Sequence, residues 1–104
     1  MHKYALHGKL TAKPGMAADL EAILLRAAVA VATVKGCLVY LIGRDQDDPD
    51  SLWVTEVWDS KEDHDNSLKK AEIKAVIAEA MPLIAEPPRK GLEWEVVGGW
   101  GLNS

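Results

Sequence analysis

The pattern of apolar and polar positions divides the chain into strands and helices. Residues 4–12, 52–58 and 92–100 alternate with a period of two, which is typical of strands. Residues 37–43 are apolar on both faces and indicate a further strand. Apolar residues recur at helical spacing over residues 16–34, which predicts a long helix between the first two strands.

A capped helix is expected directly after the strand 52–58. Ser60 and Asp63 have the spacing of a capping box, so the hydroxyl of Ser60 can accept from an amide of the first helical turn. The helix therefore starts near Lys61. Its inward face is predicted to carry His64, Ser67, Leu68 and Ala71.

Turn-forming residues mark where the other segments end. Gly36 follows the long helix as a stop signal, and the acidic run 45–50 joins two strands as a solvated hairpin loop. A second apolar stripe begins at Ile73. Pro82 must kink or end that helix near Ala80, because proline lacks an amide hydrogen and clashes with the preceding turn.

The resulting order, β-α-β-β-α-β, predicts a single domain over residues 1–104. We expect a ferredoxin-like α+β sandwich, in which an antiparallel sheet carries helices on one face. The second face of such a sheet normally meets water and is polar, yet the middle strands are apolar on both sides. A second copy of the chain would cover this face, so we expect a homodimer packed sheet against sheet.

Composition and charge exclude several classes of partner. The net charge is −4 and the twelve lysines and arginines are scattered, which argues against a surface for nucleic acid or anionic membranes. The longest apolar-rich stretch, residues 22–34, contains Arg26 and is too short to span a bilayer. Cys37 has no intramolecular disulfide partner, and no signal peptide is visible, so a cytoplasmic location is expected.

His64 is the leading candidate for chemistry. An inward-facing imidazole can act as a general base towards a phenol or an activated C–H group. The structural alternative is a histidine that bonds a backbone carbonyl and fills a gap in the core. Ser67 and Asn66 are polar neighbours of His64 and are weaker candidates for contacting a substrate, with Ser67 the more inward.

The strands supply the other candidates for a substrate site. Trp58 and Glu56 share one face of the strand 52–58, whereas Trp53 lies on the opposite face, so only one tryptophan can join His64. Trp58 could stack on a flat ring, or it could serve the core or the dimer interface. A buried Glu56 is either half of a structural pair across the dimer or a pocket acid, and Tyr40 could orient a ligand or fill the core.

No motif for a metal or a conventional cofactor is present. Asp45, Asp47 and Glu56 occupy positions 1, 3 and 12 of a calcium-type loop, but Asp50 stands where the sharp turn needs glycine. The histidines have no metal-binding spacing, and no glycine-rich nucleotide loop occurs. We therefore expect a protein that works without a metal or cofactor.

The element order, the strand end Glu56-Val57-Trp58 and the capped helix after it resemble the antibiotic biosynthesis monooxygenase domain of the dimeric α+β barrel superfamily. The resemblance extends from about Tyr4 to Trp100. It implies a relative of oxygenases that oxidise quinols and anthrone-type rings without metal or flavin. The family also contains haem-degrading relatives and members with no known reaction. Many members carry a histidine where this chain has Ser67. Here the imidazole is His64, as in a branch with a similar Ser-Lys-Glu-x-His-Asp-x-Ser-Leu run.

Residues and resemblance together predict a cofactor-independent monooxygenase that oxidises a small quinol or anthrone-like aromatic with dioxygen. His64 would be the base, with Trp58, Ser67, Asn66, Tyr40 and Glu56 around the substrate. One alternative is a non-catalytic ligand-binding or stress-response dimer on the same fold, because fold alone does not establish activity. A haem-degrading protein with His64 as axial ligand is a further alternative.

Overall fold

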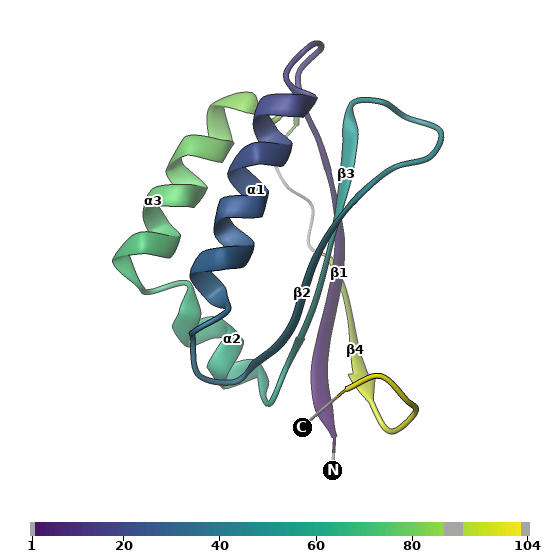
Figure 1. The fold of residues 1–104 in the computed structure, drawn as a ribbon, viewed down its shortest axis with the longest axis vertical. Helices are drawn as coiled ribbons and strands as arrows, with labels where there is room; N and C mark the ends of the chain where they lie inside the picture. Colours follow the sequence, from purple (N-terminus) through teal and green to yellow (C-terminus); the bar gives the residue numbers. More distant parts are fainter. Residues whose placement is uncertain (1, 87–90, 103–104) are drawn as a thin grey trace.

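A layer of helices covers one face of a four-stranded antiparallel sheet (Figure 1). The computed structural model describes residues 2–86 and 91–102. The elements in chain order are β1 (Lys3–Thr11), α1 (Ala17–Val31), β2 (Cys37–Arg44), β3 (Ser51–Trp58), α2 (Lys61–Ser67), α3 (Ala71–Ala80), the 3₁₀ turn η1 (Met81–Leu83) and β4 (Leu92–Val96). This arrangement confirms the predicted ferredoxin-like α+β fold.

The sheet has the strand order β2-β3-β1-β4, so β3 and β1 are its central strands. Every neighbouring pair is antiparallel. In the row that crosses the middle of the sheet, Tyr40 pairs with Glu56, Glu56 with Leu6, and Leu6 with Glu93. Directly paired residues point to the same face. Because Tyr40 packs against the core beneath α1, this row lies on the side that the helices cover.

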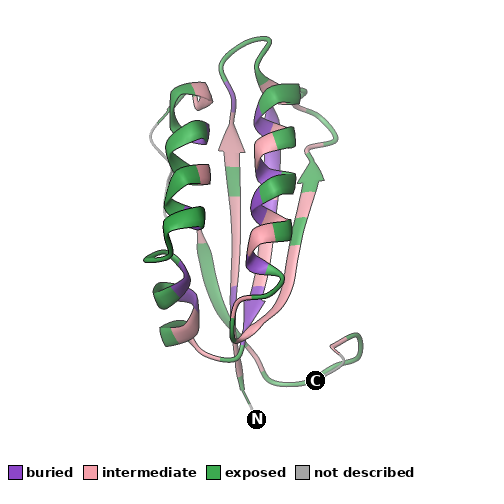
Figure 2. Ribbon diagram, turned by 60° about the vertical axis from the view of Figure 1, so that its left-hand side comes forward, coloured by how far each residue is buried: buried purple, intermediate pink, exposed green. Residues whose placement is uncertain are grey.

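The core lies between the sheet and the helices. Alternate residues of β3, among them Leu52, Val54 and Trp58, pack against α1 and α3. Figure 2 shows the buried stripe of α1 turned towards the sheet. Trp58 is only 1% exposed and is the largest of the fully buried side chains, so it contributes more apolar area to the core than any other residue described as fully buried.

The helix α2 begins as the sequence predicts. Ser60 is the N-cap, and its hydroxyl accepts from the amide of Asp63 at 3.1 Å. The side chain of Asp63 lies against Gly36, where a Cβ would come within 2.6 Å of Cγ of Asp63. Gly36 also has φ +88°, which favours glycine. The turn after α1 and the start of α2 are therefore packed together.

Two elements are shorter at their C-terminal ends than the sequence predicts. The helix α1 ends at Val31 rather than residue 34, because the chain tightens there: the amide of Val34 bonds the carbonyl of Val31, three residues back. The last strand ends at Val96 rather than residue 100. Val96 pairs with Lys3, the first residue of β1, so the chain beyond it has no strand to pair with, and Gly99 turns it with φ +123°.

The second face of the sheet carries no helix (Figure 1). By register it presents rows that include Leu41, Thr55 and Leu92, and Val57 and Trp94. Leu41 is 62% exposed, Leu92 69% and Trp94 49%. This face therefore exposes several large apolar side chains in one copy of the chain, whereas Ala5 and Val57 on the same face are buried. Within the described part of the chain, no helix is long and apolar enough to cross a membrane.

Truncating Trp58 tests how far the fold depends on it. We expect Trp58→Ala to lower the free energy of unfolding by about 3–5 kcal/mol, because it removes a fully buried indole and leaves a cavity. Denaturant unfolding at one fixed protein concentration measures this. Val29→Ala on the exposed side of α1 is the control and should change stability by less than about 0.5 kcal/mol. Equal losses in both variants would contradict the assignment of Trp58 to the core.

Candidate active site

A cavity of about 260 Å³ lies between the covered face of the sheet and the helices. Its lining is mostly aliphatic, and its polar side chains come from β2, β3 and α2. The apolar lining comes from Leu6, Leu10, Leu24, Ala27, Val31, Val54, Leu68, Ile73, Val76, Ile77, Ala80, Met81 and Ile84. The remaining lining residues are Gly8, Lys9, Tyr40, Glu56, His64, Ser67 and Gly91. A cavity of this size and character suits a small, flat, largely apolar ligand.

His64 lines this cavity from α2. The capped first turn of α2 turns the residue inward, and it is only 9% exposed. Its ring meets the indole of Trp58 edge to face, with the ring centres 5.8 Å apart, and lies 5.4 Å from the ring of Tyr4. Two aromatic neighbours therefore fix the orientation of the imidazole.

Glu56 is the second titratable group in the cavity. Its Oε1 accepts from Nε1 of Trp58 at 3.0 Å and lies 3.9 Å from Nε2 of His64. The separation from His64 is too long for a direct hydrogen bond and leaves room for a bridging hydroxyl. Burial in the apolar face of β3 raises the pKa of Glu56, while Trp58 and His64 act in the opposite direction.

The other nitrogen of His64 faces the protein surface. Nδ1 lies 2.9 Å from Oδ1 of Asp65, whose side chain is 50% exposed. This contact lowers the pKa of Asp65, as does the positive charge of Lys61 nearby. His64 therefore connects a carboxylate in the cavity to a carboxylate in solvent.

Most of the predicted substrate-site residues lie around this cavity. Tyr40 and Ser67 line it with His64 and Glu56. Burial raises the pKa of Tyr40, so its hydroxyl keeps its proton and can donate. The hydroxyl of Ser67 already donates to the carbonyl of His64 at 2.6 Å, so it can only accept from a ligand.

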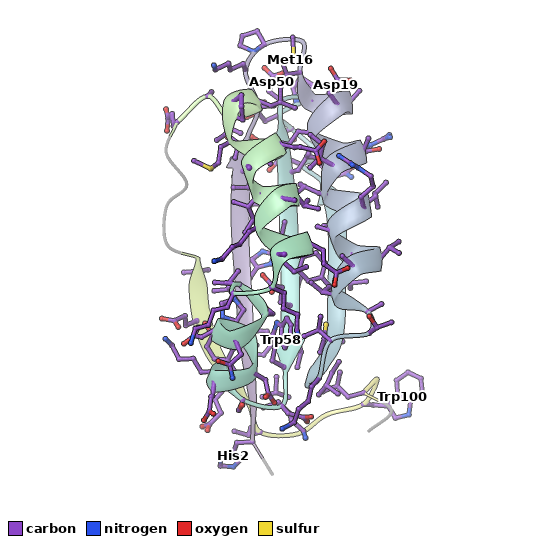
Figure 3. The ribbon with its side chains drawn as sticks, turned by 90° about the vertical axis from the view of Figure 1, so that its left-hand side faces the viewer. His2, Met16, Asp19, Asp50, Trp58 and Trp100 are labelled. Carbon is purple, nitrogen blue, oxygen red and sulfur yellow. The ribbon has the colours of Figure 1, made fainter. Side chains whose placement is uncertain are left out.

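Trp58 and Asn66 are placed differently from the other candidates. Trp58 is buried behind Glu56 and His64 and is not part of the cavity wall; Figure 3 shows it in the interior, in contrast to the protruding Trp100. It orients the two polar groups and lies outside the cavity wall, where it could not stack on a ligand. Asn66 is exposed on α2 and does not line the cavity.

Sequence reasoning missed two neighbours of His64. Tyr4 pairs with Trp58 across the strands β1 and β3, whereas strand alternation alone shows only that Tyr4 belongs to a strand. A register between strands far apart in the chain could not be read from the pattern. Asp65 lies on the exposed side of α2, so helical spacing does not point to it, yet its side chain bends back to the adjacent imidazole.

The remaining sequence candidates lie outside the cavity. Trp53 faces the open side of the sheet, where its indole stacks on His7 with ring centres 4.6 Å apart. In the acidic loop, the carboxylate of Asp45 accepts from the amides of Asp47 and Asp48 and from the indole of Trp53. The loop is thus internally bonded. In residues 2–86 and 91–102, no three histidine, cysteine or acidic side chains are grouped to hold a metal ion.

Comparison with known proteins shows the family of the chain. The profile of the family described as antibiotic biosynthesis monooxygenase matches residues 3–79, which is most of the sequence. The chain belongs to this family. A monooxygenase-like role is the general function that this membership supports. No curated protein matches the chain.

Solved structures of the family have the same fold. A "putative antibiotic biosynthesis monooxygenase" from Chloroflexus aurantiacus is 42% identical, with a TM-score of 0.87 over 97% of this chain and 99% of that one. A protein of the same description from Nitrosomonas europaea is 16% identical, with a TM-score of 0.88 over 95% of this chain and 94% of that one. Another from Deinococcus radiodurans is 26% identical, with a TM-score of 0.73 over 100% of this chain and 98% of that one. At 16% identity, the similarity shows the fold alone.

The raised pKa of Glu56 predicts how the free energy of unfolding depends on pH. Between the ordinary pKa of a glutamate and the raised one, the folded protein binds more protons than the unfolded chain, so the free energy of unfolding falls as pH rises. Glu56→Gln keeps an oxygen that can accept from Trp58 but cannot ionise. We therefore expect the variant to gain stability relative to the wild type as pH rises from about 4 to about 8.

Unfolding in denaturant across this pH range measures the effect. Glu72→Gln, which removes an exposed carboxylate on α3, controls for the loss of one negative charge. A relative stability of Glu56→Gln that falls with rising pH would show that pairing with His64, rather than burial, dominates at Glu56.

Proposed function

We propose that the protein is a cofactor-independent monooxygenase that oxidises a small quinol or anthrone-like aromatic with dioxygen. The observation that carries the proposal is the buried imidazole of His64 in the wall of an aliphatic cavity of about 260 Å³. Family membership supports the reaction class. The cavity supports the substrate class, because its apolar walls suit a flat ring and its few polar groups suit ring hydroxyl or carbonyl groups.

His64 starts the proposed reaction. Its Nε2 takes a proton from the substrate, at the CH₂ carbon of an anthrone or the hydroxyl of a quinol. The resulting anion passes one electron to dioxygen, which gives a substrate radical and superoxide. These combine through a new C–O bond to a peroxide. The substrate itself is the electron source.

Loss of water completes the proposed reaction. The peroxide takes the proton from Nε2 of His64. For an anthrone, His64 then removes the second hydrogen of the same carbon as a proton, the O–O bond breaks, and the leaving hydroxide takes that proton. A CH₂ group and dioxygen thus become a carbonyl group and water. The aliphatic walls would shield the anion and the radical pair from water.

Oxygen uptake by the purified protein tests the proposal. With an anthrone or a naphthohydroquinone as probe, we expect the wild type to consume oxygen faster than autoxidation and to place one atom of ¹⁸O₂ in the product. His64→Ala should lower kcat by about a hundredfold or more, because it removes the base. His2→Ala is the matched control, because it removes an exposed imidazole that lies outside the cavity.

The outcomes separate the alternatives. Rates equal to the protein-free control in both wild type and His64→Ala would refute the oxygenase proposal. Saturable binding of the same probe without oxygen uptake would then favour a ligand-binding protein. Equal activity of His64→Ala and wild type, both above autoxidation, would refute the role of His64.

We also propose that two copies pack through the open face of the sheet. The support is the exposure of Leu41, Leu92 and Trp94 on a face that no helix covers. The same face carries the partly exposed Trp53 on the central strand β3. Large apolar side chains exposed on one face of a sheet are typical of interfaces between protein chains.

Mass measured in solution tests the dimer. Light scattering at micromolar concentration should give about twice the chain mass for the wild type. Leu41→Glu should shift the protein towards monomer, because it buries a charge in the proposed interface. Val29→Glu, which adds the same charge to the exposed side of α1, should remain dimeric. A monomeric wild type would refute the proposal.

A further inference from the structure

His64 lies between two carboxylates that differ in exposure. On the cavity side, Nε2 lies 3.9 Å from Oε1 of Glu56, whose side chain is 13% exposed. On the solvent side, Nδ1 lies 2.9 Å from Oδ1 of Asp65, whose side chain is 50% exposed. Only the second distance is that of a hydrogen bond.

The ionisation of Asp65 decides which nitrogen carries the proton. An ionised carboxylate can only accept, so Nδ1 of His64 must donate to it. In a neutral imidazole the other nitrogen, Nε2, then has no proton and carries a lone pair. The bond to His64 and the charge of Lys61 both lower the pKa of Asp65, which keeps it ionised at neutral pH.

Neighbouring groups hold Asp65 in this position. Lys61, one helical turn earlier, lies 3.7 Å from Oδ2 of Asp65, so each oxygen of the carboxylate has its own partner. Lys61 also lies 3.8 Å from Glu93 of β4, which accepts from the hydroxyl of Tyr4. The groups that face His64 are thus Glu56 from β3, Tyr4 from β1, and Asp65 on α2 itself.

We propose that Asp65 is a positioning residue that holds His64 as the Nδ1–H tautomer and so presents the lone pair of Nε2 to the cavity. Asp65 does not line the cavity. It acts through His64, as a carboxylate does behind the histidine of a hydrolase triad. The role of Asp65 in turnover rests on the proposed function. The tautomer of His64 does not depend on that function.

The proposal fits the proton balance of the reaction. Nε2 takes each proton from the substrate and returns it to the peroxide or the hydroxide. The proton on Nδ1 stays between His64 and Asp65 throughout. While Nε2 is protonated, the imidazolium is stabilised by the charge of Asp65, which offsets the cost of a positive charge beside an aliphatic cavity.

Nitrogen NMR of the full-length protein with ¹⁵N-labelled histidine tests the tautomer. At a pH where the imidazole is neutral, wild-type His64 should be protonated at Nδ1, and the signals that disappear in His64→Ala assign it. In Asp65→Ala the proton should move largely to Nε2, where Glu56 is the nearest acceptor. Asp65→Glu should keep the wild-type tautomer. Glu62→Gln, which removes an exposed charge from the same helix, should also leave it unchanged.

Kinetics with the same variants test the role in turnover. Asp65→Ala should lower kcat at least tenfold and change KM less than threefold, because the cavity wall is intact. Asp65→Glu should recover most of the rate. Circular dichroism and thermal unfolding of each variant exclude loss of folding as the cause.

Each arm has a result that overturns the inference. A neutral wild-type His64 protonated at Nε2, or an unchanged His64 tautomer in Asp65→Ala, would refute the proposal that Asp65 determines the tautomer of His64. A shifted tautomer with unchanged kcat would refute the positioning role. A wild type with the Nδ1–H tautomer and no oxygen uptake would instead support the contact and refute the proposed function, so the two failures are distinguishable.

Discussion

The structure depends on the burial of a carboxylate in an apolar strand face. Glu56 lies in the middle of β3, a central strand, with aliphatic or aromatic residues two positions away on either side. A buried carboxylate costs stability unless it is bonded, and the bond comes from Trp58 on the same face. The largest fully buried side chain therefore has two roles: it fills the core and it satisfies Glu56. It also contacts His64, so core packing determines the geometry of the site.

The register of the sheet brings the polar groups to one end of the cavity. Tyr40, Glu56 and Leu6 form one cross-strand row, and α2 places His64 and Ser67 over it. The rest of the lining is aliphatic and comes largely from α1 and α3. A ligand with one polar edge has a single favourable orientation in such a cavity, since its polar groups find partners at one end only.

The sequence predicted the fold well because the fold depends on local patterns. Strand alternation, the Ser60 cap and the break near Pro82 are each readable within a few residues, and the structure confirms them. It predicted that His64 faces inward for the same reason. It could not show that Tyr4 reaches His64, because that contact follows from strand pairing over a long separation. Nor could it show the bond to Asp65, which depends on a side-chain rotamer.

The two faces of β3 connect the site to the proposed dimer. Glu56 and Trp58 face the cavity, while Thr55 and Val57, the residues between and beside them, face the open side. A second copy packed on that side would restrain the same backbone that positions Glu56 and Trp58. Since the distance from Glu56 to His64 leaves room for one bridging group, a small shift of β3 would change what fits there. Covering the open face would thus stabilise the geometry of the cavity as well as remove apolar surface from water.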